Sequence, residues 1–137
     1  MARSRKRVHE QTALVTVFLV RHGLAHLPVW WASSAGSARS SAPFDPRHSW
    51  AFAVAELPQA RAGQASVLLA GAVAVLYVAA GAAVVAQADA WPAVAVAAAA
   101  AGLALKALWF HAWLSFGVLL DLGVIAAVTM NCPGSLH

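Results

Sequence analysis

Apolar residues along the chain fall into four long segments separated by polar stretches. These segments cover about residues 13–31, 63–86, 91–108 and 112–130. Each is close to the roughly 20 residues that a helix needs to cross the hydrocarbon core of a bilayer. Lipid offers the backbone no hydrogen bonds, and the segments lack the alternation of a barrel strand. The pattern therefore predicts an all-α membrane fold, a bundle of four transmembrane helices.

The boundary between the third and fourth spans is inferred from length. Residues 91–130 are almost continuously apolar, and one helix of that length would be about 60 Å long at 1.5 Å per residue. Two spans joined by a tight turn fit a core of about 30 Å better. We place the turn at 106–113, where Trp109, His111 and Trp113 suit the interface, and expect Lys106 to extend toward the headgroups.

The remaining segments are predicted to lie outside the bilayer. Residues 1–12 form a basic tail, 32–62 a loop and 132–137 a C-terminal tail, so that 13–131 is a single membrane domain. Within the loop, 48–57 could form a short surface helix that Pro58 would end. The dense basic tail favours cytoplasmic termini. A secretory signal peptide is the rival interpretation of the first span.

Composition supports a membrane protein and argues against a nucleic-acid binder. The chain is 61% hydrophobic and only 10% charged, whereas soluble domains average about 25% charged. Its net charge of +4 is concentrated in the N-terminal tail, beside an apolar segment. A single cysteine, Cys132, allows no intrachain disulfide. The expected partners are the lipid bilayer and another membrane protein or a second copy of the chain, with no nucleic acid.

A polar patch interrupts the predicted membrane spans. Arg21, His22 and His26 lie in the first span, and Asp121 lies in the fourth. Arg21 and Asp121 both fall near mid-depth when helical rise is counted from the span ends. Charges at this depth are costly unless paired. We therefore expect Arg21 or the histidines to point into the bundle, within reach of Asp121.

Three interpretations of this patch stay open. It could be a structural lock, a proton or ligand pathway through the imidazoles, or a metal or haem site held by His22 and His26, which share one helix face. Further ligands could come only from Asp121, His111 or His48. His111 also suits the interface, and Glu56 is expected to be a solvated loop charge. No resident cofactor is predicted, and no catalytic template is present, which favours a protein that is not an enzyme.

Two short motifs resemble those of a known family. His22-Gly23-Leu24-Ala25-His26-Leu27 is similar to the His-Gly-x-x-His-Leu signature of an uncharacterised family of small four-helix bacterial integral membrane proteins. Residues 116–122 resemble the last-helix pattern of that family, in which Asn or Asp follows an aromatic-Gly pair, and 61–63 is similar to the start of its second span. The chain departs from the pattern at Arg21 and in lacking a proline before the fourth span. The architecture is also loosely DoxX-like.

This resemblance implies a four-helix protein of the bacterial plasma membrane, without an established activity. Together with the polar patch, it leads us to expect a multi-pass protein that serves as a non-enzymatic accessory or partner-binding subunit. The alternative is a small transporter, or a proton-coupled redox component that binds haem or a metal.

Overall fold

The structure is a computed structural model that describes residues 2–34 and 44–132, in which every regular element is helical. Four of its helices are long and apolar enough to cross a membrane, which confirms the predicted fold class. The elements, in chain order, are α1 (Ala2–Ser34), α2 (Trp50–Val54), η1 (Gln59–Arg61), α3 (Ala62–Val85), α4 (Trp91–Leu108), η2 (Ala112–Leu114) and α5 (Ser115–Thr129).

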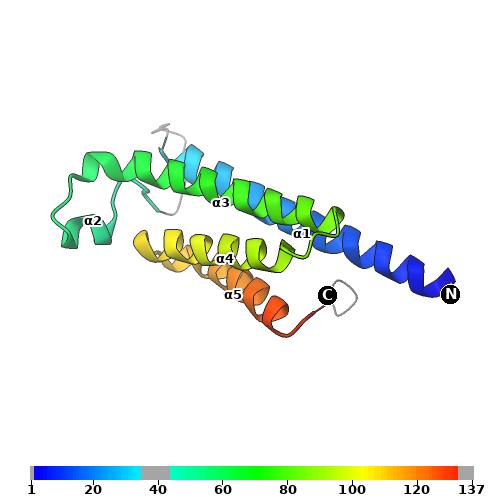
Figure 1. The fold of residues 1–137 in the computed structure, drawn as a ribbon. Helices are drawn as coiled ribbons and strands as arrows, with labels where there is room; N and C mark the ends of the chain where they lie inside the picture. The colour runs from blue at the N-terminus through cyan, green and yellow to red at the C-terminus, as the bar shows by residue number, and fades with distance from the viewer. Residues whose placement is uncertain (1, 35–43, 133–137) are drawn as a thin grey trace.

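The first helix is longer than predicted. Residues 2–12, expected to form a separate basic tail, continue as the first turns of α1. A helix of 33 residues is about 50 Å long, which exceeds a hydrocarbon core of about 30 Å. The N-terminal turns of α1 accordingly extend beyond the other helices (Figure 1).

The long helices pack as a chain of neighbours. Extensive interfaces join α1 to α3, α3 to α4 and α4 to α5, whereas no comparable interface joins α1 to α5 in the described residues. Figure 1 shows α1 beside α3, with α4 and α5 together on the other side. The bundle is therefore open between its first and last spans.

Small residues allow the close approach of the helices. Seven alanines on α3 and α4 are almost fully buried: Ala62, Ala70, Ala74, Ala80, Ala95, Ala98 and Ala99. A Cβ atom on Gly23 of α1 would lie 2.5 Å from Cβ of Tyr77, and one on Gly81 of α3 would lie 2.9 Å from Val20. Small side chains let membrane helices approach closely, and van der Waals contacts between the helices then stabilise the packing.

The connection before α3 covers the end of α4. The Ser49 hydroxyl donates to the Leu108 carbonyl at 2.6 Å, and the Trp50 indole donates to the Ala107 carbonyl at 2.6 Å. These carbonyls belong to the last turn of α4, where intrahelical partners run out. Trp109 donates in turn to the Pro46 carbonyl at 2.7 Å. The described part of the loop is therefore tied to the bundle by side chains.

A non-glycine residue with positive φ lies just beyond the C-terminal end of three helices. Glu56, Gln87 and Asn131 have φ of 55°, 53° and 52° and follow the ends of α2, α3 and α5. In each case two backbone N–H groups return to carbonyls of the last turn, the pattern of a Schellman cap. The short helix predicted over 48–57 thus ends at Val54, before Pro58 can act.

The contact at Gly23 generates a prediction. Gly23→Ala places a methyl group against Tyr77, and we expect it to lower the free energy of unfolding by about 1–3 kcal/mol. Gly71→Ala is the matched control, because a Cβ there meets nothing within 4 Å. It should leave stability unchanged or raise it by up to about 1 kcal/mol. Equal effects of both variants in SDS titrations followed by circular dichroism would contradict the close contact.

Candidate functional site

One carboxylate connects all four transmembrane helices. Asp121 of α5 is fully buried and accepts hydrogen bonds from His22 Nε2 of α1 at 2.8 Å and from Tyr77 Oη of α3 at 2.6 Å. Its other oxygen accepts from Lys106 Nζ of α4 at 2.7 Å. Three donors surround the carboxylate, and each comes from a different helix.

The ammonium group of Lys106 has three acceptors. Besides Asp121, it lies 2.9 Å from His26 Nε2 and 3.3 Å from the Gly102 carbonyl. An ammonium only donates, so His26 Nε2 must accept. His26 Nδ1 then carries the ring proton and donates to the His22 carbonyl at 3.0 Å. The hydrogen-bond pattern thereby assigns His26 as a neutral imidazole. We call His22, His26, Tyr77, Lys106 and Asp121 the polar network.

Two glycines provide the space for these side chains. A Cβ on Gly102 of α4 would lie 2.6 Å from an Asp121 carboxylate oxygen. A Cβ on Gly117 of α5 would lie 2.5 Å from Cε of Lys106. Any larger residue at either position would displace a member of the ion pair. The network therefore depends on backbone positions without side chains as well as on its charged groups.

The charges of Lys106 and Asp121 balance each other. Lys106 and Asp121 are 4% and 0% exposed, and their opposite charges cancel while His26 is neutral. The free-energy cost of removing two charges from water is offset only where the ion pair has good geometry and its remaining hydrogen bonds are satisfied. Tyr77 and His22 supply those further bonds to Asp121. The ion pair is thus neutral, and other members of the polar network largely satisfy the hydrogen bonds of its two charged groups.

The prediction that Arg21 or the histidines lie within reach of Asp121 is correct for the histidines and wrong for Arg21. Arg21 is exposed on α1, and within the described residues no hydrogen bond or ion pair engages its guanidinium. It follows directly before His22, and adjacent residues point about 100° apart on a helix. Turning His22 into the bundle therefore turns Arg21 out of it. The histidines do reach Asp121, directly through His22 and by way of Lys106 through His26.

Lys106 and Tyr77 are the members that sequence reasoning missed. Lys106 was expected to extend toward the headgroups, but its side chain turns inward because Asp121 would otherwise lack a charged partner. Tyr77 is the one ionisable side chain in the predicted second span, residues 63–86, and it could have indicated a polar contact there. The glycines four residues before Lys106 and before Asp121 were a second signal that went unused.

The secondary candidates lie away from the polar network. His48 is exposed and contacts Asp45 at 3.0 Å, and the Arg47 backbone N–H is the main reason that the pKa of Asp45 lies below its usual value. Glu56 is exposed and lies two residues beyond the end of α2. His111 is the N-cap of η2, where its ring accepts from the Trp113 backbone N–H at 3.2 Å. Within the described residues, none of these side chains bonds to Asp121 or to its partners.

A metal site at the predicted histidines would compete with Lys106. Ligand atoms of His22, His26 and Asp121 lie within 4.8 Å of one another, close enough to share an ion. The Lys106 ammonium already bonds to both His26 and Asp121, however, and acts as the cation of the cluster. Haem ligation usually uses histidines from facing helices, whereas His22 and His26 both belong to α1. These side chains therefore suit an internal ion pair better than they suit a metal ion or a haem.

The open side of the bundle forms a groove beside the polar network. We call it the α1–α5 groove and divide it into two chambers. The loop-side chamber, about 350 Å³, is lined by His22, His26 and Lys106 together with apolar residues that include Trp113 and Phe116. The terminal chamber, about 650 Å³, is lined almost entirely by apolar residues of α1 and α5 and by Trp91 and Ala95 of α4. Leu120 borders both chambers.

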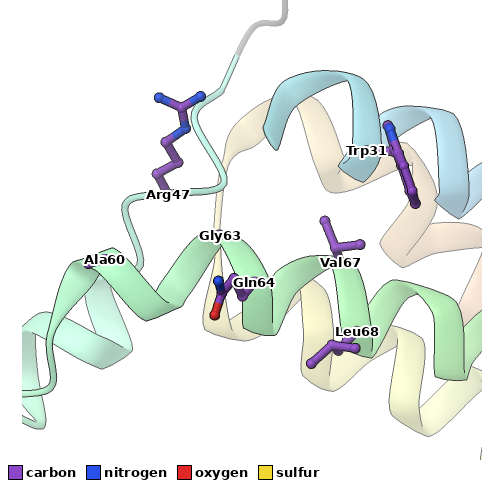
Figure 2. A pocket seen from close by; sticks show the side chains of 7 residues that line it. All are labelled: Trp31, Arg47, Ala60, Gly63, Gln64, Val67 and Leu68. Atoms are coloured by element: carbon purple, nitrogen blue, oxygen red, sulfur yellow. The ribbon is translucent and has the colours of Figure 1, made fainter. Parts of the chain in front are cut away.

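A third hollow of about 660 Å³ lies at the loop end of α3. Figure 2 shows Arg47 extending from the loop near the start of α3, with Val67 on the side of Trp31. An arginine and a tryptophan above apolar side chains are typical of the membrane–water interface. This hollow therefore marks one edge of the membrane-spanning part of the bundle.

The fold and the site together define a four-span helical membrane protein with a buried polar network around a Lys–Asp ion pair. No protein-family model, curated protein or solved structure matches this chain. The family resemblance of the two motifs therefore stays a prediction. Both motifs contribute to the same site, because the first contains His22 and His26 and the second contains Asp121.

The ion pair generates a second prediction. Lys106→Met leaves the Asp121 carboxylate without its charged partner, and we expect a loss of about 3–5 kcal/mol in the free energy of unfolding. The double variant Lys106→Met/Asp121→Leu should recover a large part of this loss, because no buried charge is left unpaired.

Arg21→Met is the matched control, because it also replaces a cation within a span by methionine. It should change stability in detergent by no more than about 0.5 kcal/mol, since Arg21 is exposed. SDS unfolding of all three variants measures the difference. A larger loss for Arg21→Met than for Lys106→Met would show that the wrong cation has been assigned to Asp121.

Proposed function

We propose that this chain is a multi-pass protein of the bacterial plasma membrane that works as a non-enzymatic accessory subunit, binding another membrane component along the α1–α5 groove. The observation that carries the proposal is the open side of the bundle. Three pairs of neighbouring helices are packed together, while two chambers that share Leu120 lie between the first and last spans.

The composition of the polar network supports a role in architecture. Catalysis needs a nucleophile, acid or base that is free to react. Asp121, Lys106 and His26 each use their principal donors or acceptors on one another. The network also joins all four spans, so its main effect is to fix their register. A stable frame with one open side suits a subunit that binds.

The distribution of charge supports the orientation. The first turns of α1 carry Arg3, Arg5, Lys6 and Arg7, the densest basic run in the chain. Basic residues beside a first span favour the cytoplasmic side. With four spans, α5 ends at the same end of the bundle at which α1 begins, as Figure 1 also shows. We therefore propose that both termini are cytoplasmic.

The groove is tested by filling it. Gly123 lines the terminal chamber, and a Cβ there meets nothing within 4 Å, so Gly123→Phe should occupy the groove without disturbing the helices. Gly71→Phe is the matched control on α3, where a Cβ also meets nothing within 4 Å. Native mass spectrometry of protein purified in mild detergent should find a bound component on the wild type and on Gly71→Phe, and none on Gly123→Phe. Equal retention by both variants, or an unoccupied wild type, would contradict the proposal.

A second candidate function is proton transfer in a transporter or a proton-coupled component. His22 favours it, because this side chain lines the loop-side chamber and holds Asp121 through Nε2, while no described hydrogen bond engages its Nδ1. His22→Gln keeps a donor for Asp121 and removes the titratable ring. If proton transfer is the function, proteoliposomes containing a pH-sensitive dye should show proton flux that His22→Gln abolishes. An accessory subunit should show no flux in either form.

A further inference from the structure

Arg21 is a cation on the outer surface of a membrane-spanning helix. The candidate span that contains it runs from Arg5 to Trp31, and the side chain is exposed. It takes no part in the polar network, where Lys106 already supplies the positive charge for Asp121. An arginine in a transmembrane segment usually faces a bundle interior or has a partner. Among residues 2–34 and 44–132, Arg21 has neither.

The depth of Arg21 makes this exposure costly. Arg21 lies ten residues, or about 15 Å of helix, before Trp31, which borders the interfacial hollow at the loop end. This is about half of a hydrocarbon core of roughly 30 Å. Its neighbour His22 contacts Asp121, which itself lies near the middle of the span Ala112–Thr129. An arginine that far from either interface gains only part of its solvation by snorkelling.

Arg21 also lies at the edge of the α1–α5 groove. Ala25 and Leu14 line the two chambers from α1, and both are exposed. On a helical wheel Arg21 lies about 40° from Ala25 and about 20° from Leu14. Gly23, which faces α3, lies about 160° away. A molecule in the groove would therefore contact the side of α1 that carries Arg21.

A second copy of the chain is a poor partner for this cation. The acidic residues of the sequence are Glu10, Asp45, Glu56, Asp89 and Asp121. Only Asp121 lies near the depth of Arg21, and it is fully buried with three donors. A two-fold symmetric pair along this face would also bring Arg21 toward its own copy, which repels.

We propose that the component bound along the groove is a transmembrane helix of a different protein, with an acidic side chain that pairs with Arg21 in the bilayer. This inference rests on the proposed function and names the chemistry of the partner. Burial between two helices shields both charges from lipid. The groove supplies apolar walls on either side of the pair. The exposed Arg21 then acts as the specificity determinant, while Lys106 and Asp121 hold the frame.

Model peptides test the pairing directly. A transmembrane peptide of leucine and alanine with a single central Glu, and a matched peptide with Gln, are mixed with the labelled protein in phosphatidylcholine vesicles at alkaline pH. Energy transfer measures association. We expect the Glu peptide to bind about tenfold more tightly than the Gln peptide. Arg21→Gln should reduce this ratio to about one, whereas Arg61→Gln, which removes an exposed cation at the end of η1, should leave it unchanged.

The Gly123→Phe variant distinguishes the proposed groove function from the proposed acidic partner of Arg21. If Gly123→Phe weakens both peptides while the wild type shows no preference for Glu, the groove binds helices but the acidic partner is wrong. If the preference for Glu depends on Arg21 and survives Gly123→Phe, pairing occurs away from the groove and the proposed function fails. A preference for Glu that disappears when phosphatidylglycerol is added would assign Arg21 to an anionic headgroup and overturn the inference. A preference that Arg21→Gln leaves intact would overturn it as well.

Discussion

The bundle depends on the hydrogen bonds and the ion pair of the buried Asp121 carboxylate. Its oxygens accept hydrogen bonds from His22, Tyr77 and Lys106, so each of the other three spans sends one donor to the same point. Hydrophobic burial gives membrane helices little reason to choose one register, because lipid is as apolar as their side chains. A charge that must be paired does give such a reason. The apolar packing of alanines and glycines then follows the alignment that the carboxylate sets.

Glycine is the counterpart of this charged centre. Gly102 and Gly117 leave the space that Asp121 and Lys106 occupy, and Gly23 lets α1 approach the part of α3 that carries Tyr77. The family-like motif at 22–27 therefore combines two requirements in adjacent positions, a donor at His22 and a missing side chain at Gly23. Two adjacent residues of this short motif thus contribute both to the polar network and to the close packing of α1 on α3.

The two intramembrane cations have opposite roles because of their positions. Lys106 belongs to α4, which is packed between α3 and α5, and its long side chain can reach the interior. Arg21 belongs to α1, which has the open groove on one side, and it follows a histidine that already faces inward. One cation consequently completes the frame, while the other is presented to the surroundings. The proposed binding function rests on this asymmetry together with the open side of the bundle.

The sequence by itself determined the class of fold and most helix bounds, since the length of an apolar segment in a bilayer decides whether it spans. It also identified His22, His26 and Asp121 as polar residues at similar depth, because helical rise converts residue number into depth. Only the tertiary structure decided which cation meets Asp121, since that depends on the rotation of each helix and on the reach of a side chain across an interface. The same reason separates Arg21 from the polar network, which includes Tyr77 and Lys106.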